Sequence, residues 1–242
     1  MIGGDLPEQI EVYMRIGRSS VRLLEESLAS LDRGPEDVRA VLDLGCGYGR
    51  VTRQLVRSFD AQAVSVFDVD PGAAEFCEQE FGVNGLSFKD RWDWSAVPFA
   101  TYDVVWAGSV FTHLSESFAR ETLSVLSRIT APAGMLVFTT HGPESLSRVR
   151  EGFYGDRCRQ LADSIVESLG STGFCFVPYT RDELAVLPFT FQRPSDFGLS
   201  WHSEARIRAL IAEASHGRLE VVDYRNRGWE SHQDVVVCRR LP

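Results

Sequence analysis

The chain has 242 residues, of which 44% are hydrophobic and 24% are charged, a composition typical of a globular protein with a sizeable core. Its formal net charge of −9 disfavours a nucleic-acid partner, because an acidic surface repels phosphate backbones. No apolar run approaches the length of about 18 residues that a membrane crossing needs, so no membrane span is expected.

The first predicted element is a helix over residues 7–31, where apolar residues recur every three or four positions. Pro7 suits the first turn of this helix, and the pair Gly34-Pro35 ends the segment. We therefore assign residues 1–36 to an N-terminal helical cap.

From Val38 to His141 the pattern alternates between strand and helix. Short apolar runs predict strands at residues 38–44, 63–68, 86–89, 102–107 and 135–140. Helices are predicted between them, at residues 48–59, 71–81 and 115–129. In the second of these, Asp70 is expected to cap the helix and Gly82 to stop it. Alternating strands and helices imply a parallel sheet covered on both faces, which binds ligands beyond the carboxyl ends of its strands.

The rest of the chain is less regular at first. Residues 143–201 are rich in glycine, proline and aromatic residues, and we interpret them as an insertion that covers the site and binds the acceptor. Residues 202–242 contain a helix capped by Ser203, followed by strands at 219–224 and 234–238. These elements would complete the core, whose cofactor-binding half is assigned to residues 37–142.

The most informative segment is Val41–Arg50, in which an apolar strand runs into glycines at 45, 47 and 49. Glycine lets the chain turn sharply and lets a ligand approach the main chain, and the next helix presents free N–H groups. A dinucleotide fingerprint has the spacing G-x-G-x-x-G and binds pyrophosphate. Here the spacing is G-x-G-x-G, and Asp43 lies two residues before the first glycine. Its carboxylate would repel pyrophosphate and attract a cationic group, such as the amino group of a methionine moiety.

The segment 42–49 resembles the first motif of the class I S-adenosylmethionine-dependent methyltransferases. In that family an acid ends the second strand and binds both ribose hydroxyls, and Asp68 stands 19 residues past Gly49. A polar or acidic residue after the third strand contacts the adenine amino group, and Asp90 matches it. The resemblance covers residues 38–141 well and the closing helix and strands in outline.

This resemblance implies an α/β, doubly wound, mostly parallel seven-stranded sheet of the Rossmann-like type, with an antiparallel last strand and an inserted lid. It implies S-adenosyl-L-methionine as cofactor and S-adenosyl-L-homocysteine as product. The implied cofactor-binding residues are Asp43, Gly45, Cys46, Gly47, Tyr48, Gly49, Asp68, Val69, Asp90, Arg91, Trp92 and Gly108.

Each assignment has an ordinary structural alternative. Asp43 would otherwise bond the glycine loop, and Asp70 competes with Asp68 because residues two apart point to the same side of a strand. Pro71 follows Asp70, which favours a helix cap there. Tyr13 and Arg15 on the N-terminal helix are further candidates for closing over the cofactor.

A hydroxyl acceptor would need a base, and histidine titrates near neutral pH. His113 and His141 follow the fourth and fifth predicted strands, at the carboxyl edge of the sheet, and are the candidate catalytic residues. The alternative is that each hydrogen-bonds a loop. His202 and His232 are weaker candidates, and the four histidine spacings match no metal-ligand pattern, so no metal is expected.

The sequence restricts the class of methyl acceptor only broadly. Trp106-Ala-Gly-Ser109 differs from the Asn/Asp-Pro-Pro-aromatic motif of the amino-group methylases of nucleic acids. Segments 45–50, 109–114 and 139–142 are similar to bacterial methyltransferases associated with glycan or secondary-metabolite pathways. We therefore expect O-methylation of a hydroxylated small molecule. A cofactor-binding module without turnover, a nicotinamide-dependent oxidoreductase, and a nucleic-acid or protein methyltransferase stay open as alternatives.

The cysteines indicate the redox state of the cellular compartment. There are five, without a C-x-x-C pair, which indicates free thiols in a reducing environment. The first residues lack a basic segment followed by an apolar run, so no signal peptide is expected. Both observations predict a cytoplasmic location, and neither predicts an oligomeric state.

Overall fold

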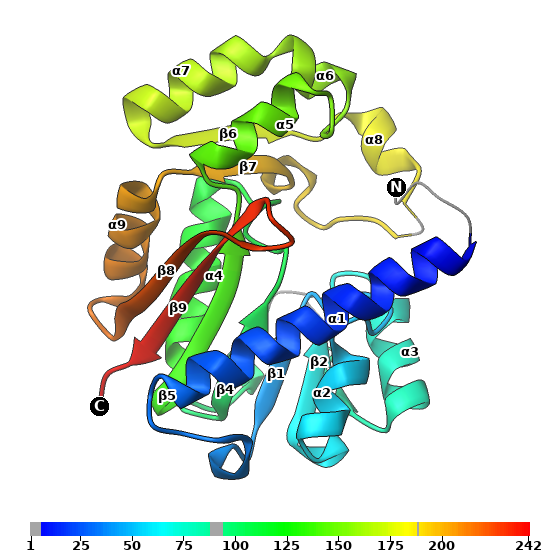
Figure 1. Ribbon diagram of the computed structural model, residues 1–242, viewed down its shortest axis with the longest axis vertical. Helices are drawn as coiled ribbons and strands as arrows, with labels where there is room; N and C mark the ends of the chain where they lie inside the picture. The colour runs from blue at the N-terminus through cyan, green and yellow to red at the C-terminus, as the bar shows by residue number, and fades with distance from the viewer. Residues whose placement is uncertain (1–5, 88–93, 188) are drawn as a thin grey trace.

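The computed structural model describes residues 6–87, 94–187 and 189–242, and its main feature is a seven-stranded sheet (Figure 1). The strands lie in the order β3-β2-β1-β4-β5-β9-β8, and only β9 runs against its neighbours. This confirms the predicted fold class, including the antiparallel last strand. The strands are β1 Val41–Leu44, β2 Val64–Phe67, β3 Asn84–Gly85, β4 Tyr102–Ala107, β5 Thr130–Thr140, β8 Leu219–Trp229 and β9 Gln233–Arg240.

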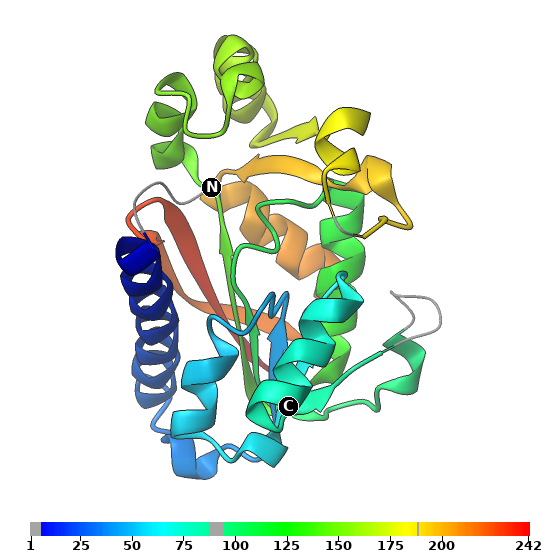
Figure 2. The same cartoon turned by 90° about the vertical axis from the view of Figure 1, so that its right-hand side faces the viewer.

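Helices cover both faces of the sheet, as Figure 2 shows. One face packs against α1 (Leu6–Ala29), α2 (Thr52–Ser58) and α3 (Pro71–Phe81), and the other against α4 (Glu116–Ile129) and α9 (Glu204–Ser215). None of the described helices combines the length and apolar character that a membrane crossing requires.

The strand sequences are continuous apolar runs because successive side chains point to opposite faces of the sheet and both faces are covered. In β4, Val104 belongs to the cluster under α1 and α2, whereas Val105 belongs to the cluster under α4 and α9. Met135 and Leu136 divide in the same way in β5. Successive residues of a strand point to opposite faces, so a sheet covered on both faces buries every position.

The insertion lies over the carboxyl edge of the sheet (Figure 1) and contains more regular structure than its sequence pattern predicted. It holds α5 (Leu146–Arg150), α6 (Asp156–Gln160), α7 (Ala162–Thr172), β6 (Phe174–Pro178), α8 (Arg181–Ala185) and β7 (Gly198–His202). Strands β6 and β7 form a separate antiparallel pair with its own apolar cluster, and β7 crosses the predicted boundary after residue 201. The four-part division of the chain therefore stays a prediction.

Helix ends were predicted better than the third strand. Asp70 caps α3 by accepting a 3.0 Å hydrogen bond from the N–H of Gly72, and Gly82 ends the helix with a left-handed φ of 67°. Helix α2 begins at Thr52 rather than at residue 48, because Gly47 and Gly49 have positive φ angles that a helix does not allow. Strand β3 lies two residues before the predicted start at residue 86. Short 3-10 helices lie at Pro35–Asp37, Ala61–Ala63, Trp94–Ala96, Pro143–Ser145 and Pro194–Asp196.

Candidate active site

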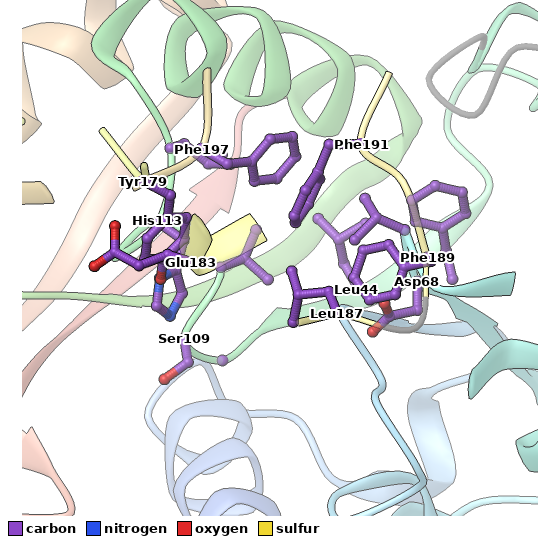
Figure 3. A pocket seen from close by; sticks show the side chains of 16 residues that line it. Leu44, Asp68, Ser109, His113, Tyr179, Glu183, Leu187, Phe189, Phe191 and Phe197 are labelled. Atoms are coloured by element: carbon purple, nitrogen blue, oxygen red, sulfur yellow. The ribbon is translucent and has the colours of Figure 1, made fainter. Parts of the chain in front are cut away.

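A cavity of about 490 Å³ lies at the carboxyl edge of the sheet, beneath the insertion (Figure 3). It opens next to β1 and β4, where the strand order reverses, the position at which open α/β sheets bind ligands. The core contributes Leu44, Gly45, Phe67, Asp68, Val69, Gly108, Ser109, Val110, His113 and Leu114 to its lining. The insertion contributes Tyr179, Glu183, Leu187, Phe189, Phe191 and Phe197.

Gly45 of the glycine loop lines the cavity, and all three glycines of this loop adopt backbone angles that other residues rarely take. Gly45, Gly47 and Gly49 have φ angles of 76°, 48° and 78°. A Cβ at Gly45 would lie 2.6 Å from Val110, and one at Gly49 would overlap the ring of Phe81. A Cβ at Gly47 would meet nothing within 4 Å, so this peptide faces open space that a ligand can occupy.

Asp68 connects the glycine loop to the end of β2. Its Oδ2 accepts a 2.8 Å hydrogen bond from the N–H of Gly47, and its Oδ1 accepts a 2.9 Å hydrogen bond from the N–H of Asp70. Burial raises the pKa of Asp68, while these N–H donors oppose the shift. A carboxylate offers about four acceptor positions, so acceptor capacity is left for ligand hydroxyls. Asp70 instead caps α3 and accepts from the hydroxyl of Tyr48 at 3.2 Å.

Asp43 lies behind the loop rather than in the cavity. It is 1% exposed, it is absent from the cavity lining, and its Oδ2 accepts a 2.7 Å hydrogen bond from the hydroxyl of Thr52. Burial raises the pKa of Asp43 to about 7. The carboxylate contacts Thr52 in this structure, and its predicted contact with a ligand amino group stays a prediction.

The other predicted cofactor residues divide into three groups. Gly45, Val69 and Gly108 line the cavity. Cys46 is buried and Tyr48 is 54% exposed, and neither lines the cavity. Asp90, Arg91 and Trp92 lie outside the described residues, so their predicted contacts with adenine stay predictions.

Helix α1 contacts the glycine loop, while the predicted closure of Tyr13 and Arg15 over the cofactor stays a prediction. The hydroxyl of Tyr13 donates a 2.8 Å hydrogen bond to the carbonyl of Tyr48. Arg15 turns away from the loop and forms a 2.6 Å ion pair with Glu230. Of the two candidates on this helix, Tyr13 is therefore the one that contacts the glycine loop.

His113 lines the cavity, and its hydrogen bonds define which ring nitrogen is available. Its Nδ1 lies 3.0 Å from the carbonyl oxygen of Gly198 and 2.7 Å from the hydroxyl oxygen of Tyr179. A carbonyl oxygen only accepts, so Nδ1 carries the hydrogen and Nε2 keeps the lone pair. Burial lowers the pKa of His113, which keeps the ring neutral and able to take a proton.

His141 has a different environment. It is 3% exposed, it does not line the cavity, and its ring packs against Tyr154 and Trp201. Its Nδ1 donates a 3.1 Å hydrogen bond to the carbonyl of Ser200, and burial lowers its pKa well below the usual value. This position favours the structural alternative for His141.

The two weaker histidine candidates also lie away from the cavity lining. His202 is fully buried on β7, with Nδ1 2.9 Å from the hydroxyl of Thr140, and His232 packs against the ring of Phe153. Within residues 6–87, 94–187 and 189–242, no cluster of three or more His, Cys, Asp or Glu side chains is arranged to hold a metal ion.

Sequence reasoning missed three polar residues of the cavity. Tyr179 was one aromatic residue among many in the insertion, and burial raises its pKa to about 12. Glu183 accepts a 2.6 Å hydrogen bond from the N–H of Thr180 and pairs with Arg157 at 3.3 Å; the Thr180 N–H holds the pKa of Glu183 below its usual range. The third is Ser109, whose hydroxyl accepts a 2.6 Å hydrogen bond from the side-chain amide of Gln233 on β9. Most of their contacts join residues that are distant in the sequence. The exception is the helix cap at Thr180, which the Thr-x-x-Glu spacing could have predicted.

Comparisons with known proteins identify similarity to methyltransferases. A family model described as "Methyltransferase domain" matches residues 42–136. Two curated relatives are malonyl-[acyl-carrier protein] O-methyltransferases. The one from Halalkalibacterium halodurans is 29% identical over 59% of this chain and 52% of its own length, and the one from a Paenibacillus species is 26% identical over 77% and 73%. The chain thus spans about half the length of the first relative.

A solved structure supports the fold. The S-adenosylmethionine-dependent methyltransferase from Clostridium acetobutylicum superposes with a TM-score of 0.59, covering 98% of this chain and 99% of that one at 13% identity. At this identity the likeness establishes the architecture, and the cavity residues have to be argued from this chain alone.

Proposed function

Since the chain belongs to the class I S-adenosylmethionine-dependent methyltransferases, we propose that it transfers the methyl group of S-adenosylmethionine to the oxygen of a hydroxylated small molecule. The observation that carries the proposal is the hydrogen bond from the Gly47 N–H to Asp68, at 2.8 Å. It joins the glycine loop to the acid at the end of β2, and Gly45, Asp68 and His113 all line the same cavity.

The residues present fit this cofactor. The open space at Gly47 leaves room for a ligand against the main chain, and Asp68 retains acceptor capacity for the ribose hydroxyls. Leu44, Phe67 and Val69 provide an apolar surface beside that acid. The Asp43 carboxylate behind the loop favours the cationic amino end of the cofactor over a diphosphate.

The bound cofactor supplies an electrophilic methyl group on a sulfonium centre. The cavity aligns the acceptor oxygen with that group, and alignment alone can lower a barrier by several kcal/mol. As the oxygen–carbon bond forms and the sulfur–carbon bond breaks, the acceptor hydroxyl loses its proton. We assign that proton to Nε2 of His113, because Nδ1 is held by Gly198 and Tyr179.

A hydroxyl acceptor fits the lining better than a carboxylate. The lining contains the acids Asp68 and Glu183, and none of its described residues is a lysine or arginine. A negatively charged acceptor would therefore enter without a counter-charge. The names of the relatives refer to a malonyl group on an acyl-carrier protein; for this chain we propose a small-molecule acceptor.

The domain roles and the location follow the same reasoning. The insertion, residues 143–201, would supply the acceptor side of the cavity, and α1 within residues 1–36 would cover the glycine loop. All five cysteines are buried and unpaired, which supports a reducing compartment, and we propose the cytoplasm.

The test is a transfer assay with isotope-labelled S-adenosylmethionine and a panel of hydroxylated sugars and polyketide-like aromatics, with products identified by mass spectrometry and NMR. We expect a methyl ether whose formation depends on His113. Products methylated only on nitrogen or on a carboxylate would contradict the proposal. Tight cofactor binding with no transfer to any acceptor would favour a binding module without turnover.

A further inference from the structure

The cavity has a polar end formed by the core and the insertion together. Figure 3 shows His113, Tyr179 and Glu183 on one side of the cavity, with Asp68 and Phe189 on the other. The rings of His113 and Tyr179 are nearly parallel, with centroids 6.1 Å apart and an interplanar angle of 28°. The acid assigned to the ribose and the base therefore lie at separate ends, which leaves the polar end for the acceptor.

The hydrogen bonds at this end determine where the Tyr179 hydrogen points. The N–H at Nδ1 of His113 already donates to the carbonyl oxygen of Gly198, which cannot donate in return. The hydroxyl oxygen of Tyr179, 2.7 Å from the same nitrogen, can therefore only share that hydrogen as a second acceptor. Its own O–H must point elsewhere, and in the described part of the chain no second partner of this hydroxyl is found.

The phenol of Tyr179 stays a donor under ordinary conditions. Burial raises its pKa to about 12, so the hydroxyl keeps its hydrogen at neutral pH. Because Tyr179 lines the cavity, this O–H is available to an acceptor there. Tyr179 is half-buried, and a ligand that covers this donor without accepting from it would lose about 1–3 kcal/mol, so a ligand oxygen is favoured at this position.

The aromatic wall that runs across the cavity from this donor suits a flat ring. Phe191 and Phe197 have centroids 4.0 Å apart at an interplanar angle of 32°, and Phe189 meets Phe191 edge-on at 5.1 Å. Aromatic surfaces of this kind favour offset-stacked or edge-to-face contacts with another ring. The single acid at this end, Glu183, is already paired with Arg157, so a cationic acceptor has no free partner there.

We propose, on the basis of the function proposed above, that Tyr179 is an acceptor-binding residue that donates a hydrogen bond to a hydroxyl oxygen of a neutral phenolic compound. The ring of this compound packs against Phe191 and Phe197. Tyr179 remains protonated throughout, so it holds the oxygen and takes no part in the proton balance.

Binding to the protein loaded with S-adenosylhomocysteine tests this proposal. Isothermal titration would compare 4-nitrophenol, kept un-ionised by the buffer, with nitrobenzene, which lacks the hydroxyl, and with 4-nitrobenzoate, which carries a negative charge. We expect 4-nitrophenol to bind about tenfold more tightly than nitrobenzene, since its hydroxyl oxygen accepts the hydrogen bond of Tyr179. We expect 4-nitrobenzoate to bind more weakly than 4-nitrophenol.

The variant Tyr179→Phe removes one oxygen and should reduce the preference for 4-nitrophenol to about threefold, leaving nitrobenzene binding unchanged. Tyr154→Phe is the matched control, because Tyr154 is another tyrosine of the insertion and does not line the cavity. It should keep the full preference. Cofactor-product affinity should be unchanged in both variants, which also shows that they fold.

The outcomes separate this inference from the proposed function. Failure of the wild-type chain to bind S-adenosylhomocysteine would overturn the proposed function, and this inference with it. Normal binding of that product would leave the function standing. The inference alone would be overturned if 4-nitrophenol and nitrobenzene bound equally well or not at all, or if 4-nitrobenzoate bound more tightly than 4-nitrophenol. It would also be overturned if Tyr179→Phe kept the full preference for 4-nitrophenol over nitrobenzene.

Discussion

The backbone N–H of Gly47 donates a 2.8 Å hydrogen bond to the carboxylate of Asp68, although the two residues belong to different strand–helix connections. The bond fixes the glycine loop after β1 against the acid after β2. A ligand that contacts one of these groups therefore lies close to the other, which makes the pair the geometric basis of the proposed cofactor site.

The first prediction concerns Asp68. Replacement by alanine removes the acceptors for the ribose hydroxyls and releases Gly47, so Asp68→Ala should weaken S-adenosylhomocysteine binding at least tenfold, about 1.4 kcal/mol. Isothermal titration measures this directly. The matched control is Asp70→Asn, because asparagine caps a helix as well as aspartate does, and its dissociation constant should stay within about twofold. Equal effects of the two variants would remove the ribose assignment from Asp68.

The second prediction concerns pH and Asp43. With its pKa raised to about 7 by burial, Asp43 is protonated below that value and ionised above it. Only the carboxylate attracts the cationic amino group, so product affinity should rise with pH and be roughly fivefold weaker at about pH 6 than at about pH 8. Titrations across this range provide the measurement.

The variant Asp43→Asn separates this binding effect from folding. The folded chain holds the Asp43 proton between about pH 4 and 7, where the unfolded chain releases it, so this group contributes less stability as pH rises through that window. At about pH 8, Asp43→Asn should unfold at the same temperature as the wild type or higher, yet bind the product more weakly and without the pH dependence. Unchanged affinity in this variant would exclude an electrostatic role for Asp43.

The third prediction distinguishes the two candidate bases. His113→Gln removes the proton acceptor from the cavity and should lower the transfer rate about a hundredfold or more, with product affinity retained. His141→Ala leaves the Ser200 carbonyl unpaired and opens a cavity between Tyr154 and Trp201, so it should lower the free energy of unfolding by about 2 kcal/mol. Single-turnover rates and denaturant unfolding of both variants provide the test. A stable His141→Ala protein with a transfer rate as low as that of His113→Gln would reverse the assignment.

The fourth prediction concerns acid stability at the junction of core and insertion. Burial lowers the pKa of His202 to about 4, whereas an unfolded histidine titrates near 6.5. The unfolded chain therefore binds more protons between these values, and stability is lost as pH falls from about 6.5 to 4. His202→Asn should reduce this pH dependence. His216→Asn, at the exposed end of α9, should leave it unchanged; identical profiles for wild type and His202→Asn would refute the linkage.

How far the sequence predicted the structure depended on whether the signal was local. The cap at Asp70, the stop at Gly82 and the cap at Ser203 were correct, because each depends on residues within one turn. Most core strands were found from their apolar runs. Strand β3 was misplaced because its two residues, Asn84 and Gly85, carry no apolar pattern.

The acceptor side could not be predicted for the same reason. Tyr179 meets His113 across 66 positions of the chain, and neither residue has a neighbour in sequence that indicates the contact. Asp43 was assigned to the ligand from its place in the motif, but the sequence does not tell whether a strand residue faces the cavity or the side that packs on Thr52. Both outcomes depend on long-range packing.

The most direct test of the central assignment is a calorimetric titration of the purified chain with S-adenosylhomocysteine and, in parallel, with NAD. The glycine loop with two acids beside it should bind the sulfur nucleoside at one site per chain and show no measurable affinity for the diphosphate-containing dinucleotide. Saturable binding of NAD, with none of S-adenosylhomocysteine, would contradict the account.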